Sequence, residues 1–154
     1  MLPRVFYEEM LAQARAELPN ECCGMLAGRI EPAEGGSMPR GLVLRRFPLV
    51  NELASPTEYL LESKSWRPAL MATEKEQMAV LAFYHSHPRS DPVPSRKDRA
   101  GSEYYPQAMH LIISLKEPEP LMRAWWLTPA DHSEGTFVLA DSEPAQQIDR
   151  GPAT

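Results

Sequence analysis

The sequence has 154 residues, 43% of them hydrophobic, which is enough for one buried core and gives no reason to expect a second domain. Its formal net charge of −5 argues against nucleic acid as a ligand, because a phosphate-binding surface needs clustered Lys and Arg. We find neither a signal-peptide pattern nor an apolar run near the roughly 18 residues of a membrane span, so we expect a cytoplasmic protein without a membrane partner.

The two cysteines of the chain, Cys22 and Cys23, are adjacent. A disulfide between neighbours closes a strained ring and gives little of the loop-closure stabilisation of an ordinary disulfide. Both thiols are therefore expected to be reduced, in agreement with a cytoplasmic location. As side chains of a buried apolar run, they are expected to pack rather than to act as nucleophiles.

The first part of the chain predicts a helix followed by short strands. Apolar side chains recur at roughly helical spacing over residues 4–18, and Pro19 ends this helix. A short apolar run at 22–28 and β-rich runs at 42–44 and 47–50 then predict neighbouring strands, joined through a glycine-rich connection.

A second helix is predicted over residues 65–77, with Ser65 as its cap and Pro68 in its first turn. The following run, 78–84, is apolar throughout, which is typical of a strand buried on both faces. This strand leads directly into His85-Ser86-His87-Pro88, so the two histidines are expected at its end.

The last third of the chain predicts a short helix, three strands and a tail. Ser95 opens a helical pattern over 95–104. The strand-like runs fall at 111–115, 121–127 and 136–139. The residues after them are polar or small, so we expect one domain over 1–140 and a flexible tail over 141–154.

His85 and His87 stand two residues apart on an extended strand, so both rings point to the same face and can reach one ion. Catalytic zinc sites use three protein ligands and leave a fourth position open. Asp98 supplies the third ligand if the loop before it folds back over the histidines. Simpler interpretations exist for each part. A His-x-His pair alone is more often a surface pair than a ligand pair, and Ser95 with Asp98 alone is a helix-start pattern.

The combination of these residues is more specific than either part. The chain resembles, position for position, the signature of the JAMM (MPN-plus) metallopeptidase family. The matching pattern is His85-Ser86-His87-Pro88, then five residues, Pro94-Ser95, two more residues and Asp98. Upstream, the segment from Asn20 to Gly28 is similar to the family's Glu-containing first strand and likewise follows the first helix. The resemblance covers roughly residues 4–128.

This resemblance implies an α/β fold with a mixed, curved β-sheet flanked by helices, related to the cytidine-deaminase architecture. It also implies one zinc ion per chain bound by His85, His87 and Asp98, with Glu21 as general base and acid and Ser95 stabilising the oxyanion. From sequence position alone, Glu21 would instead be a solvated residue beside a helix end, and Ser95 an N-cap.

Two other functions are compatible with parts of the pattern. Many MPN domains have lost the ligands and serve as non-catalytic scaffolds in protein assemblies, but the residues retained here argue against that function. A zinc deaminase would need His-x-Glu and a spaced Pro-Cys-x-x-Cys, whereas this chain has His-x-His and two adjacent cysteines. A zinc-dependent metallopeptidase or isopeptidase is therefore the leading hypothesis.

The resemblance to stand-alone bacterial members of the family implies a partner as well. Such an enzyme would cleave the amide bond after the C-terminal Gly-Gly of a ubiquitin-like or sulfur-carrier protein. We expect the partner's tail to add as a strand at a sheet edge where the 78–84 strand gives way to a loop, because edge pairing gives affinity regardless of side chains. The glycines would lie nearest the metal, since a narrow approach admits residues without a Cβ most easily.

The other polar and aromatic residues of interest are assigned no metal role. His110 is expected on a strand and His132 in a loop, neither with a partner at ligand spacing. Asp91, in the loop after the histidines, is either an alternative ligand or, more simply, a turn residue. Trp125 and Trp126 are neighbours on a strand, so one is expected to pack inward and the other to face out.

Overall fold

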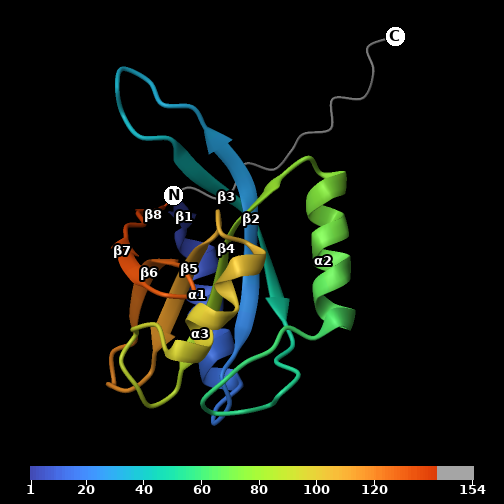
Figure 1. Ribbon diagram of the computed structural model, residues 1–154, viewed down its shortest axis with the longest axis vertical. Helices are drawn as coiled ribbons and strands as arrows, with labels where there is room; N and C mark the ends of the chain where they lie inside the picture. Colours follow the sequence, from blue (N-terminus) through green and yellow to red (C-terminus); the bar gives the residue numbers. More distant parts are fainter. Residues whose placement is uncertain (142–154) are drawn as a thin grey trace.

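The computed structural model describes residues 1–141 as a six-stranded sheet with helices on both faces, beside a pair of short strands (Figure 1). The elements are β1 (Leu2–Pro3), α1 (Arg4–Ala16), β2 (Cys23–Glu31), β3 (Arg40–Leu49), α2 (Ser63–Lys75), β4 (Ala79–His87), α3 (Arg96–Ala100), the 3-10 helix η1 (Ser102–Tyr104), β5 (Met109–Ser114), β6 (Leu121–Leu127), β7 (His132–Gly135) and β8 (Leu139–Ala140). The main sheet has the order β3-β2-β4-β5-β6-β7, in which β4 and β5 are parallel and the other neighbours antiparallel. The predicted mixed α/β fold is confirmed.

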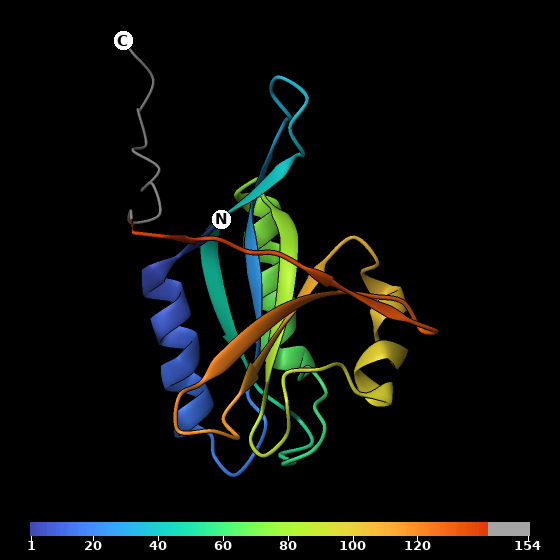
Figure 2. The same ribbon diagram turned by 90° about the vertical axis from the view of Figure 1, so that its left-hand side faces the viewer.

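The two faces of the sheet are covered by different helices, because side chains alternate along each strand. Leu26 and Tyr84 belong to the apolar cluster that includes Met10 and Ala14 of α1. Figure 2 shows α1 along one side of the sheet. On the opposite face, Met25 and Phe83 pack with Ala69 of α2. His85 and His87 follow Phe83 at spacing two, so they share the α2 face.

Several predicted boundaries were wrong in the first half of the chain. The runs at 42–44 and 47–50 belong to one strand, β3, which pairs continuously with β2 apart from one bulge. Helix α2 begins at Ser63, two residues before the predicted cap, so Pro68 lies in its second turn. Ser65 is not the cap because its hydroxyl donates to Glu62 O and accepts from Val50 N, which ties the helix start to the end of β3.

The second half also departs from the predictions at its end. Gly101 separates α3 from η1, so the predicted 95–104 helix is two short pieces. The predicted strand at 136–139 is wrong: β7 lies earlier, where it pairs with β6, and β8 pairs in parallel with β1. The β1–β8 pairing joins distant segments, and no local pattern encodes it. Of the predicted 141–154 tail, the structure describes Asp141, and 142–154 lie outside the described residues. Within the described part, no helix is long and apolar enough to cross a membrane.

The position of β4 inside the sheet limits where a substrate strand can add. β4 pairs with β2 on one side and, as far as the His87–Ser114 pair, with β5 on the other. The free edges of the main sheet are β3 and β7. The end of β3 is already covered, since Val50 exchanges hydrogen bonds with Glu62 and Ser65. Addition of a substrate strand beside β4 is therefore excluded.

Candidate metal centre

Three side chains that can bind a metal converge at the end of β4. His85 and His87 are its last residues on the α2 face, and Asp98 comes from α3. The Nε2 atoms of the two histidines are 3.1 Å apart. Asp98 Oδ1 is 3.3 Å from His85 Nε2, and Asp98 Oδ2 is 3.3 Å from His87 Nε2. The structure thus brings together all three residues that the sequence predicted as ligands.

The spacing of these donors fits a tetrahedral zinc ion. Ligands about 2.0–2.1 Å from such an ion stand about 3.3 Å from one another. The two histidine Nε2 atoms are 3.1 Å apart, and each lies 3.3 Å from one of the two Asp98 oxygens, so the three side chains are close enough to share one ion. Two imidazole nitrogens and one carboxylate are also the donor set of a catalytic zinc site with an open position. All three side chains are buried, so bulk water does not compete for them freely.

The rings of the two histidines are held by different contacts. His87 Nδ1 lies 2.7 Å from Asp91 O, a carbonyl that can only accept, so Nδ1 carries the proton and the Nε2 lone pair is free to bind an ion. The His85 ring stacks on Tyr59, with 4.5 Å between ring centroids. His85 Nδ1 is buried without a partner in the described residues.

Asp98 is fixed by the start of α3. Ser95 Oγ accepts from Asp98 N at 3.1 Å, and Ser95 N donates to Asp98 Oδ2 at 2.7 Å, which is a complete capping box. Burial alone would raise the pKa of Asp98, but His85, His87 and the Ser95 amide hold that pKa below its usual range. The helix-start interpretation is therefore confirmed, and the same cap orients the carboxylate towards the histidines.

Glu21 is placed by its backbone, two residues before β2. The next residue, Cys22, donates from its N–H to Ser86 Oγ at 2.8 Å, and its carbonyl accepts from Ser86 N. Both bonds hold Cys22 beside Ser86, the residue between the two histidines. Glu21 N donates to Ser55 O, and Asn51 Nδ2 donates to Glu21 O. The chain is thus held on both sides of Glu21.

The Glu21 carboxyl group is only 3% exposed, and its Oε2 has no partner in the described residues. Burial, opposed by the nearby His87 and reinforced by Asp98, raises the pKa of Glu21 to about 7. A carboxyl group that titrates near neutrality can both accept and donate a proton at physiological pH. The alternative interpretation, a solvated residue beside a helix end, is wrong.

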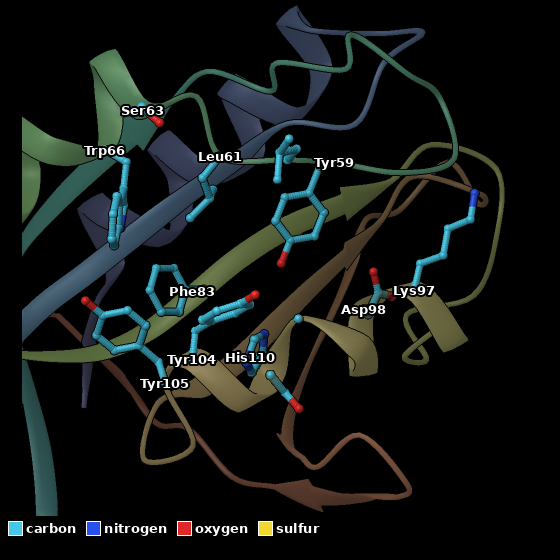
Figure 3. A pocket seen from close by; sticks show the side chains of 13 residues that line it. Tyr59, Leu61, Ser63, Trp66, Phe83, Lys97, Asp98, Tyr104, Tyr105 and His110 are labelled. Atoms are coloured by element: carbon cyan, nitrogen blue, oxygen red, sulfur yellow. The ribbon is translucent and has the colours of Figure 1, made fainter.

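A cavity of about 450 Å³ has Asp98, one of the three donors, in its lining (Figure 3). Six of its thirteen lining residues carry aromatic rings: Tyr59, Trp66, Phe83, Tyr104, Tyr105 and His110. Figure 3 shows Trp66, Phe83 and Tyr105 gathered at one end and Asp98 at the other. Burial, and next the neighbouring His85, lower the pKa of His110 to about 4, so this ring is neutral at pH 7. The aromatic pocket is therefore an apolar site beside the donors.

The remaining candidates lie outside the group of donors. Asp91 contributes its backbone to His87, while its side chain pairs with Lys116. His110 is on β5, as expected, whereas His132 begins strand β7 rather than lying in a loop. The cysteines are free and buried, and burial raises the pKa of both thiols. Trp125 packs inward and Trp126 is 43% exposed, which confirms their predicted division.

The sequence did not reveal the aromatic pocket. Tyr59, Trp66 and Tyr105 come from a loop, a helix and the segment after η1, and Tyr105 lies 39 residues beyond Trp66 in the chain. No periodic or spaced pattern connects them. The only signal is that aromatic residues are frequent between Tyr59 and Tyr105.

Comparison with known families shows to which family the chain belongs. The family described as prokaryotic homologs of the JAB domain matches residues 3–128, which include all five predicted site residues. The chain belongs to this family. The resemblance to JAMM proteins drawn from the histidine, serine and aspartate spacing is therefore confirmed.

Two curated relatives and one solved structure illustrate this membership. The chain is 34% identical over 110 residues to the CysO-cysteine peptidase of Mycobacterium tuberculosis, which covers 71% of this chain and 68% of that protein. It is 39% identical over 98 residues to the probable TtuB-protein conjugate cleaving protease of Thermus thermophilus, covering 63% of this chain and 59% of that protein. A solution structure from Desulfitobacterium hafniense matches with a TM-score of 0.76 and 32% identity, over 92% of this chain and 93% of that one.

Proposed function

We propose that this chain is a zinc-dependent peptidase or isopeptidase whose catalytic domain is residues 1–140. Its target is the amide bond after the C-terminal Gly-Gly of a ubiquitin-like or sulfur-carrier protein. The observation that carries the proposal is the buried, unpaired Glu21 oxygen, close enough to His87 and Asp98 for their charges to shift its pKa. The names of the two relatives, which refer to CysO-cysteine and to TtuB-protein conjugates, support a conjugate as substrate.

Zinc would be held by His85 Nε2, His87 Nε2 and a carboxylate oxygen of Asp98. When bound, zinc supplies Lewis acidity that makes water more acidic and polarises a carbonyl group. Glu21 takes the proton of the attacking water and passes it to the leaving amine. Ser95 uses its oxygen to accept from Asp98 N, so its own hydroxyl proton is free to donate to the oxyanion.

Glu21 also sets the direction in which the substrate lies. Because Glu21 protonates the leaving amine, the leaving group belongs on its side, where a cavity of about 310 Å³ is lined also by Glu17 and Asn20. The acyl part then extends past Asp98 into the aromatic pocket. A large apolar side chain upstream of the glycines would fill that pocket. This path takes the place of strand addition at β4.

Two substitutions test the proposal by separating metal binding from chemistry. Elemental analysis of the wild-type protein should give one zinc ion per chain. His87→Ala should lose both zinc and hydrolysis of a carrier extended beyond its Gly-Gly. Glu21→Gln should keep zinc and lose most hydrolysis, because an amide cannot accept the proton of water.

The outcomes distinguish the proposal from its alternative. Normal turnover by His87→Ala would overturn the ligand assignment, and normal turnover by Glu21→Gln would place the base elsewhere. A wild-type protein that binds no zinc and cleaves no carrier would make a non-catalytic scaffold the better description.

A further inference from the structure

Three consecutive carbonyl groups in the loop between β4 and α3 each accept a hydrogen bond from a side chain of the sheet. The pairs are Ser114 Oγ with Ser90 O at 2.6 Å, His87 Nδ1 with Asp91 O at 2.7 Å, and Trp125 Nε1 with Pro92 O at 2.8 Å. The donors come from three neighbouring strands, β5, β4 and β6. The loop is therefore fixed to the sheet at three successive residues.

The middle bond of the three acts on a zinc ligand. Asp91 O can only accept, so it holds the His87 proton on Nδ1 and leaves the Nε2 lone pair facing His85 and Asp98. The orientation of the His87 ring follows the position of this carbonyl. Any movement of the loop at Asp91 is passed directly to His87.

The two outer bonds are made by buried donors that cannot exchange their partner for bulk water. Ser114 is 4% exposed and lies opposite His87 in the β4–β5 register. Trp125 is 5% exposed and packs with Ile112 and Leu127, so its indole N–H is held in one place. A buried donor that loses its acceptor is left unsatisfied, which makes both bonds costly to break.

We infer that Trp125 and Ser114 are positioning residues for the metal centre, which hold the Ser90–Pro92 carbonyls so that Asp91 O orients the His87 ring. This inference rests on the proposed zinc function. Neither residue belongs to the group of donors, and neither has been given a role by the site described above. Partners that orient a metal-bound histidine typically contribute about 10- to 100-fold to metal affinity.

Zinc affinity, measured by competition with a chelator, tests the inference without an activity assay. Trp125→Phe keeps an aromatic ring, smaller than the indole, and removes the N–H. Ser114→Ala removes the second outer donor. Both variants should bind zinc about 10- to 100-fold more weakly than the wild type. Cobalt-substituted protein should show shifted visible absorption bands in both, because these bands report ligand geometry. Trp126→Phe, one residue along on the opposite face and exposed, is the matched control and should leave affinity and spectrum unchanged.

Each result has a defined meaning. Wild-type affinity and spectrum in both folded variants would overturn the positioning role and leave the zinc proposal intact. A wild-type protein without zinc affinity would overturn both proposals. Circular dichroism establishes that each variant is folded, and Ser114→Ala, the smaller change, decides the inference if Trp125→Phe does not fold.

Discussion

At the scale of single residues, Glu21 shows how a buried carboxyl group acquires a useful pKa. Its backbone is held by Ser55 and Asn51, so the side chain cannot turn outward without breaking these bonds. Removal from water then disfavours the charged form and raises the pKa to about 7. The same burial makes the ionised form destabilising for the fold, which is a measurable effect.

We therefore predict that Glu21 makes the metal-free protein less stable as the pH rises. A carboxyl group whose folded pKa is raised above its unfolded value stabilises the fold below about pH 4.5, and this stability is lost as the pH passes through about 7. One unit of pKa shift corresponds to about 1.4 kcal/mol, and solvent screening reduces the total for Glu21. We therefore expect the free energy of unfolding to fall by about 1–3 kcal/mol as the pH rises.

Urea unfolding of metal-free wild type and Glu21→Gln at pH 5 and pH 8 checks this prediction. Gln does not titrate, so the difference in unfolding free energy between the two proteins should shift in favour of Glu21→Gln as the pH rises. His87 and Asp98 titrate in both proteins, so their contributions largely cancel in the difference. Parallel stabilities at the two pH values would contradict the pKa assigned to Glu21.

At the scale of elements, α3 begins at a serine that is an observed N-cap and a proposed oxyanion donor. Its capping box connects Ser95 and Asp98 through both backbone N–H groups, and the helix is only five residues long. So short a helix has little stability of its own. The cap therefore both starts the helix and places Asp98, the proposed ligand. The observed and the proposed role of Ser95 can be separated by replacements that differ in hydrogen bonding.

We predict that Ser95→Ala lowers kcat by about 10²- to 10³-fold through loss of the oxyanion donor, and lowers stability by about 1 kcal/mol through loss of the cap. Ser95→Asp should restore the cap, since Asp is a good N-cap, yet leave kcat low because a carboxylate has no proton to donate. Thermal unfolding and steady-state kinetics of both variants check this. If Ser95→Asp recovers turnover together with stability, the serine is a cap alone.

Elements formed by contacts between residues close in sequence could be predicted, whereas those formed by contacts between distant residues could not. The β4 strand with His85 and His87 could be predicted because an apolar run and spacing of two are local. The Ser95 cap is likewise local. The placement of Glu21 depends on pairing between Cys22 and Ser86, 64 residues apart, and became predictable only through family resemblance. The position of β8 depends on pairing with β1, which no local pattern records.

At the scale of the whole molecule, the two faces of the sheet differ: one packs into the core and the other carries the candidate site. One face packs on α1 through an apolar cluster, and the other presents the histidines between the 51–62 segment and α3. Lys97 of α3 forms an ion pair with Glu58 of that segment, which joins the two walls beside the site. Tyr59 covers His85 from the same segment. A substrate must therefore reach the proposed zinc ligands through a passage with walls on two sides.

A passage of this kind predicts strong selection for glycine beside the cleaved bond. Residues with a Cβ would contact the walls formed by Tyr59 and the Lys97–Glu58 pair, displacing the carbonyl from Glu21 and Ser95. Misplacement by about 1 Å can lower a rate 10²-fold. We expect a ubiquitin-like carrier extended beyond Gly-Gly to be cleaved at least about 100-fold faster than the same carrier with Val-Val there, with Ala-Ala between them. Measurement of kcat/KM for the three carriers checks this, and equal turnover of all three would mean that the passage is open and that the chain is a general peptidase.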